Sequence, residues 1–221
     1  MKRNTGRDGF TLVEMLVVIG IIAILVGASV GGYSFAVQRA EATRGRELVS
    51  NVATALNVLF QRQNRWPPSL LQESLGDGRL TPRAAACLAV SGLMSLSYVT
   101  EESEGETVYT LSGLDRCGIV SPWAAAVLKR TDPKMGASKA LQLKVPGGGT
   151  VESHQLHFAL DDDGDGIVEV RFNDSPPISV RANAVVWCWG QNGKEDGYSA
   201  SMSGRGKADD IYSWTKAQEV Q

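Results

Sequence analysis

Three aspartates alternate along the chain directly before a glycine: Asp161, Asp163, Asp165 and Gly166. Alternating carboxylates open many calcium-binding loops, because they direct hard oxygen ligands inward while the glycine permits a sharp turn. The twelfth position of such a loop is Phe172 here, so the bidentate glutamate that closes an EF-hand is absent. The segment therefore predicts either a calcium site or a solvated hairpin turn.

A second residue that could have a chemical role is Glu14, which precedes a long uncharged run. The stretch from Met15 to Gln38 contains no Asp, Glu, Lys or Arg. Crossing a bilayer takes roughly 20 apolar residues, so the chain from Leu12 to about Val30 is long enough. A charge inside such a span costs about 2.5–3.5 kcal/mol on insertion scales and usually marks a function with a partner charge. We therefore expect Glu14 to pair with a positive group, and an amino terminus is the obvious one.

The residues before Glu14 carry a resemblance that supplies this amino terminus. A short basic leader ends at a Gly9–Phe10 junction, and Glu14 is the fifth residue after it. This arrangement resembles the class III signal of type IV pilins and type II secretion pseudopilins. The resemblance implies cleavage after Gly9 by prepilin peptidase, N-methylation of Phe10, and polymerisation through Glu14 and the Phe10 ammonium of a neighbour. A carboxylate and an ammonium that leave water together are far less costly than either alone.

Two other interpretations of the N-terminus are available from the sequence. A secretory signal peptide would have an apolar region of about 7–15 residues and a small-residue cleavage site, for which Val26-Gly27-Ala28 is passable. Against it, Glu14 would lie inside the apolar region, and the apolar run is too long. The other interpretation is a plain membrane anchor with an incidental glutamate. Positive charge before the span predicts a cytoplasmic N-terminus, with the rest of the chain outside the cytoplasm.

The elements that follow predict an α+β fold. Apolar residues spaced by three and four define one helical face: Val49, Val52, Leu56, Leu59 and Phe60. Pro67-Pro68 predicts the end of this helix. Thr81-Pro82 and Ser121-Pro122 predict the starts of short helices through about 94 and 130. Strands are predicted at 95–100 and 107–111 as a hairpin, and at 141–145, 155–160, 167–172 and 178–189. We expect a pilin-like long N-terminal helix packed on a mostly antiparallel β-sheet.

The C-terminal region carries the second resemblance. Residues 187–197 and 204–214 resemble the calcium loop of type II secretion major pseudopilins, which opens Leu-Gly-Ala-Asp-Gly and finishes Asp-Ile…Trp. The resemblance implies Ca²⁺ ligands at four positions: the Trp189 carbonyl, Asn192, Asp209 and Asp210. The sequence departs from the pattern because Asn192 stands where the family has aspartate and because the intervening loop is longer. A glycine-rich surface loop is the alternative.

Composition and motifs give no support for a nucleic-acid-binding protein or an enzyme. The 221 residues carry a formal net charge of −2 with no basic stripe, so nothing indicates a nucleic-acid partner. No Ser/His/Asp or Cys/His arrangement indicates an enzyme. Three cysteines, Cys87, Cys117 and Cys188, would allow one disulfide and one thiol in an oxidising compartment, and their pairing stays open.

These features lead to one functional expectation. Residues 1–9 form the leader, 10–38 the transmembrane and assembly half of the helix, and 39–221 the periplasmic domain. We expect an inner-membrane pseudopilin of a type II secretion pseudopilus. Its expected partners are prepilin peptidase, other pseudopilins or pilins, the inner-membrane assembly platform and the membrane itself. The alternatives are a type IV pilus subunit for adhesion or motility and a membrane-anchored, calcium-dependent binding module.

Overall fold

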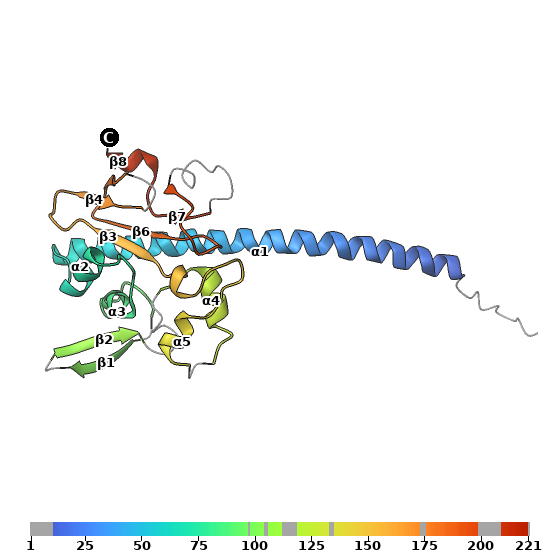
Figure 1. Ribbon diagram of the computed structural model, residues 1–221, viewed down its shortest axis with the longest axis horizontal. Coiled ribbons are helices and arrows are strands. Elements are labelled where there is room, and N and C mark those ends of the chain that lie inside the picture. Colours follow the sequence, from blue (N-terminus) through green and yellow to red (C-terminus); the bar gives the residue numbers. More distant parts are fainter. Residues whose placement is uncertain are drawn as a thin grey trace, which may run out of the picture. The chain divides into compact units, whose positions relative to one another are not determined.

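The computed structural model describes residues 11–96, 98–103, 106–111, 119–132, 135–172, 176–198 and 209–220 (Figure 1). The chain divides into two compact units, residues 1–41 and 42–221. Helix α1, Leu12–Gln63, contributes residues to both units.

The first unit consists, in its described part, of the N-terminal portion of α1. Its large apolar side chains are exposed along the helix, with Leu12 at 80% and Ile24 at 73%. The Ser29 hydroxyl turns back to donate to the Leu25 carbonyl at 2.7 Å. A helix that is apolar on all sides needs cover from protein or lipid, because its surface is unfavourable in water.

The end of α1 comes before the two prolines that predict it. Asn64 adopts a φ of 50°, and its N–H donates to the Phe60 carbonyl at 2.7 Å. Asparagine is among the few residues that tolerate this left-handed conformation at a helix end. Pro67 then precedes α2, Pro68–Leu75, a helix that the sequence analysis did not predict.

The predicted apolar face of α1 forms the centre of the second unit. Val49, Val52 and Leu56 have no exposed surface, and Leu59 is also buried. Gly45 permits close packing on the same helix, because a Cβ there would lie 2.6 Å from Cδ1 of Ile211. The amphipathic half of the helix is therefore confirmed as part of the core.

Three further helices surround this core. They are α3 (Pro82–Val90), α4 (Pro122–Leu128) and α5 (Ala137–Leu141). The Thr81 hydroxyl caps α3 as predicted, since it accepts the N–H of Ala84 at 3.3 Å. The start of α4 is also as predicted, but the Ser121 hydroxyl makes no cap and bonds to Nδ1 of His154 at 2.9 Å.

The described strands form three antiparallel sheets rather than one. The strands are β1 (Tyr98–Ser103), β2 (Glu106–Leu111), β3 (His157–Leu160), β4 (Ile167–Val170), β5 (Ile178–Arg181), β6 (Ala184–Cys188), β7 (Ile211–Tyr212) and β8 (Glu219–Val220). The sheets have the orders β1-β2, β3-β6-β7 and β4-β5-β8, and the hairpin β1–β2 lies against α3 (Figure 1). An α+β fold with a long helix packed on antiparallel strands is thus confirmed.

Strand β6 joins two apolar regions, because all five of its residues are buried. Ala184, Val186 and Cys188 belong to the core around α1, whereas Val185 and Trp187 face a second cluster. We call this second group the aromatic cluster: Val168, Val170, Phe172, Val180, Val185, Trp187, Tyr198 and Trp214. The alternation follows from the two-residue period of a strand.

Two strand predictions are wrong. The predicted strand 141–145 begins at the last residue of α5. Lys144 forms only an isolated bridge with Thr150, because the chain reverses between them through glycines 147–149, all with positive φ. The predicted strand 178–189 is divided at Ala182–Asn183 into β5 and β6, which enter different sheets. The Asn183 carbonyl accepts the N–H of Asp161 at this break, at 2.8 Å.

Candidate functional site

The C-terminal region brings three carboxylates together: Asp196, Asp209 and Asp210. One carboxylate oxygen from each lies within 4.8 Å of the others. The pairing of β6 with β7 positions them, since Cys188 is opposite Ile211 and the residues following one strand meet those preceding the other. We call this group the C-terminal carboxylate group.

Backbone N–H groups hold most of the carboxylate oxygens in place. Asp210 accepts the N–H of Gly190 at 3.2 Å and that of Asp196 at 2.9 Å. Asp209 accepts the N–H of Gln191 through Oδ2 at 2.7 Å. A Cβ on Gly190 would lie 2.0 Å from Oδ1 of Asp209, so only glycine fits there. The group is therefore assembled by the backbone of two separate chain segments.

One oxygen of this group has no partner. Oδ1 of Asp209 is buried and accepts no hydrogen bond from any described residue. Burial raises the pKa of Asp209, and the nearby Asp196 carboxylate raises it further, against the lowering effect of the Gln191 N–H. Three acidic groups that leave water without a counter-charge repel one another. A hard cation such as calcium, which takes oxygen ligands, would relieve this repulsion.

The structure places one of the other two predicted ligands beside the group. Asn192 donates from Nδ2 to Oδ1 of Asp196 at 2.7 Å, while its Oδ1 accepts the N–H of Lys194 at 2.8 Å. The Trp189 carbonyl is directed away from Asp210, because the Gly190 N–H of the same trans peptide donates to that carboxylate. Sequence reasoning missed Asp196, which lies within the same loop and offers a third carboxylate.

A glycine turn supports the Asn192 segment from outside. Nε2–H of His154 donates to the Gly148 carbonyl at 3.1 Å, so its Nδ1 accepts from the Ser121 hydroxyl. A Cβ on Gly148 would lie 2.7 Å from the Asn192 carbonyl oxygen. The fully buried His154 therefore fixes a turn that packs directly on the loop of the carboxylate group.

Asp161, Asp163 and Asp165 of the 161–166 loop also lie close together, but their carboxylates already accept hydrogen bonds from backbone N–H groups of the same loop. Asp161 is buried and accepts the N–H of Gly164 and that of Gly166, each at 2.8 Å. Asp163 accepts the N–H of Asp165 at 3.2 Å, and Asp165 that of Ile167 at 2.7 Å. One carboxylate oxygen from each aspartate lies within 4.8 Å of the others, so this group could also hold a metal ion.

The N-terminal residues are placed only in part. Gly9 and Phe10 lie outside the described residues. Glu14 is exposed in the first turn of α1, where its Oε2 accepts both the N–H and the hydroxyl of Thr11 at 2.8 Å. The carboxylate therefore turns back to Thr11, the residue directly before the helix.

The two described cysteines add no reactive group to these sites. Cys87 and Cys188 are free thiols, and Cys117 lies outside the described residues. Burial raises the pKa of Cys188 to about 12, with Asp210 and Asp209 adding to the effect. A thiol with so high a pKa is inert at neutral pH.

Comparison with known families decides the identity of the N-terminal segment. Residues 4–30 match the family described as "Prokaryotic N-terminal methylation motif". This segment therefore carries the N-terminal methylation motif of type IV pilins and pseudopilins. No curated protein and no solved structure matches the chain.

The methylation motif has several direct consequences. It marks a structural subunit rather than an enzyme, and it implies processing by prepilin peptidase and polymerisation with other pilins. The motif also implies anchoring in the inner membrane and a periplasmic or pilus location. Within the residues that the structure describes, none of the helices combines the length and the apolarity that a membrane crossing requires.

Proposed function

We propose that this pilin-family chain is a pseudopilin subunit of a type II secretion pseudopilus, a periplasmic filament that drives protein export. The observation that carries the proposal is the C-terminal carboxylate group. It lies in the segment that resembles the calcium loop of major pseudopilins, and it holds a buried oxygen of Asp209 without a partner.

Calcium fits the residues of this group. Asp196, Asp209 and Asp210 would supply carboxylate oxygens, and the Trp189 carbonyl and Asn192 remain proposed ligands. The Asn192 amide would have to turn over to offer its oxygen, because its nitrogen now contacts Asp196. Bound calcium would supply the positive charge that the repelling carboxylates lack, and weak sites of about 10⁻⁴–10⁻³ M occur in extracellular modules. The 161–165 loop is proposed as a second, weaker site.

The proposed assembly depends on the first unit. Its exposed apolar side chains would be covered by lipid before assembly and by neighbouring helices afterwards. Glu14 would exchange its Thr11 contacts for the methylated Phe10 ammonium of a neighbouring subunit, after cleavage at Gly9. The helix would cross the inner membrane once, with its N-terminus in the cytoplasm and residues 39–221 in the periplasm.

The processing and the charge pairing can be tested on one variant. Glu14→Ala should insert and be cleaved as the parent is, because a neutral residue enters the membrane more easily. Intact-mass analysis should give N-methyl-Phe10 as the first residue in both proteins. Crosslinking between the N-terminal helices should be lost or irregular in the variant. A first residue at Ser29 would instead support a signal peptide, and regular filaments of Glu14→Ala would rule out this charge pairing.

Gene deletion in the native host would discriminate between the two filament systems. Loss of extracellular enzyme release with surface pili unchanged supports the pseudopilus. Loss of pili with export unchanged supports the type IV pilus subunit. A membrane-anchored calcium-dependent binding module would leave both unchanged. The deletion is complemented with the parent gene and with Glu14→Ala, so that an assembly defect is separated from loss of the chain.

A further inference from the structure

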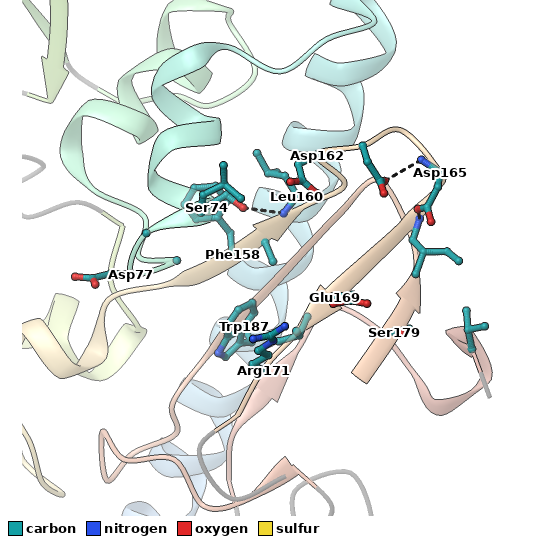
Figure 2. Close-up of a pocket in the computed structure, with 18 residues that line it drawn as sticks. Ser74, Asp77, Phe158, Leu160, Asp162, Asp165, Glu169, Arg171, Ser179 and Trp187 are labelled. Carbon is teal, nitrogen blue, oxygen red and sulfur yellow. Dashed lines mark hydrogen bonds between the residues drawn. The ribbon is translucent and has the colours of Figure 1, made fainter. Parts of the chain in front are cut away.

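A cavity of about 820 Å³ opens between β3, β4 and the turn that follows α2 (Figure 2). None of the three residues of the C-terminal carboxylate group lines it. The walls come from the end of α2 and residues 76–78, from β3, from the 161–166 loop, and from β4 and β5. This cavity is therefore separate from the proposed calcium site of the C-terminal loop.

The rim of the cavity is acidic. Five exposed carboxylates line it, with one guanidinium: Asp77, Asp162, Asp163, Asp165, Glu169 and Arg171. The single salt bridge between described residues, Arg79–Glu152, involves none of them. The rim thus favours a cationic ligand and disfavours an anionic one.

The wall of the cavity includes Trp187, which is only 7% exposed. In the view of Figure 2, Trp187 and Arg171 lie on the other side of the cavity from Asp162 and Asp165. The indole N–H of Trp187 is buried and has no acceptor among the described residues. Because this N–H has no accessible surface, an occupant of the cavity meets the ring and not this donor.

The backbone beside the cavity offers further groups. In the sheet order β4-β5-β8, β4 is an edge strand with β5 as its strand neighbour. The cavity is lined by three of the four residues of β4: Ile167, Glu169 and Val170. The outer edge of such a strand presents backbone N–H and carbonyl groups, to which an extended peptide can add as another strand. A helical ligand could not do this, because its own backbone groups are already bonded within the helix.

We propose that this cavity binds an extended segment of a partner protein that carries lysine or arginine side chains. The segment adds to the edge of β4, and its cations face Asp162, Asp165 and Glu169. The two observations are independent, since the charge selects the cation and β4 selects an extended backbone. The proposal does not depend on which filament system the chain serves.

Binding of short labelled peptides to the full-length chain in detergent micelles tests the proposal. The first probe is a fluorescent octapeptide of alternating lysine and valine, followed by anisotropy at constant calcium. The second replaces lysine with glutamate, and the third keeps lysine but carries N-methyl groups on alternate amides. The lysine peptide should bind, and both other probes should bind about tenfold more weakly or worse. Equal binding of the N-methylated probe would overturn strand addition, and equal binding of the glutamate probe would overturn charge selection.

Matched variants locate the binding. Glu169→Gln should weaken the lysine peptide about threefold, as expected for one exposed ion pair. Glu47→Gln removes an exposed glutamate of α1 that does not line the cavity and should leave binding unchanged. Equal weakening by Glu169→Gln and Glu47→Gln would overturn the assignment to this cavity.

Discussion

In the 161–166 loop Asp161, Asp163 and Asp165 each accept a hydrogen bond from a backbone N–H within five residues, so the loop is held by its own chain. The C-terminal carboxylate group is assembled differently, because Asp209 and Asp210 reach Asp196 from 13 and 14 residues away. That assembly leaves a buried oxygen of Asp209 without a partner among the described residues. From this difference we expect the cation at the C-terminal carboxylate group rather than at the loop whose alternating aspartates the sequence displays.

The largest expected effect is calcium stabilisation through the C-terminal carboxylate group. Calcium at 100 times its dissociation constant should raise the free energy of unfolding by about 2.7 kcal/mol for a site that exists only in the folded state. Asp209→Asn keeps an acceptor for the Gln191 N–H but removes a charge, so it should abolish this gain. Thermal unfolding in chelator, calcium and magnesium measures it, and magnesium should act little because it demands tighter octahedral geometry.

Asp163→Asn serves as the matched control for that experiment, because it removes one charge from the exposed part of the other loop. It should leave most of the calcium response intact. If the melting temperature of the parent chain is the same in chelator and in calcium, both loops are solvated turns. If Asp163→Asn removes the response and Asp209→Asn does not, the comparison between the loops is reversed.

The second effect concerns the loop that is held by its own backbone. Asp161→Asn should lower the free energy of unfolding by about 2 kcal/mol even in chelator, because one of two backbone N–H groups would face an amide nitrogen instead of an oxygen. Asp163→Asn, at an exposed position with one hydrogen bond, should stay within about 0.5 kcal/mol of the parent. Denaturant unfolding in chelator measures both. A loss at Asp161 that calcium fully restores would contradict a purely structural role.

The sequence predicted those parts of the fold that depend on local pattern. The spacing of Val49, Val52 and Leu56 identifies a buried helical face, and Thr81 caps the helix it was expected to cap. Predictions failed where distant contacts decide the structure. Ser121 bonds to His154 instead of its own helix, and β5 and β6 separate because they pair with different strands.

The candidate site was predictable to a similar extent. The resemblance pointed to Asp209 and Asp210, which precede β7 directly. Asp196 was missed because its position depends on a long loop that returns the chain to β6, and no local pattern encodes that return. The unpartnered Trp187 N–H was also invisible, because a tryptophan in a strand gives no sign of whether its indole finds an acceptor.

The smallest expected effect is the pH dependence of the free energy of unfolding without calcium. It is also the most direct test of the difference between the two loops. The pKa of Asp209 is raised above its ordinary value of 3.8, first by burial and then by the Asp196 carboxylate, so the folded state holds this proton more tightly than the unfolded state. The corresponding stability is fully present below pH 3.8 and is lost as the pH rises through the raised pKa. Solvent screening keeps the effect small, because Asp209 is only half-buried.

The measurement is the free energy of unfolding of the parent chain minus that of Asp209→Asn, both in chelator. This difference should fall as the pH rises from 3.8 through the raised pKa of Asp209. Asp165→Asn should leave the same fall intact, because Asp165 belongs to the other loop. Calcium should reverse the slope, since the cation binds the deprotonated carboxylate, and a flat difference in chelator would mean that the Asp209 oxygen is solvated rather than buried.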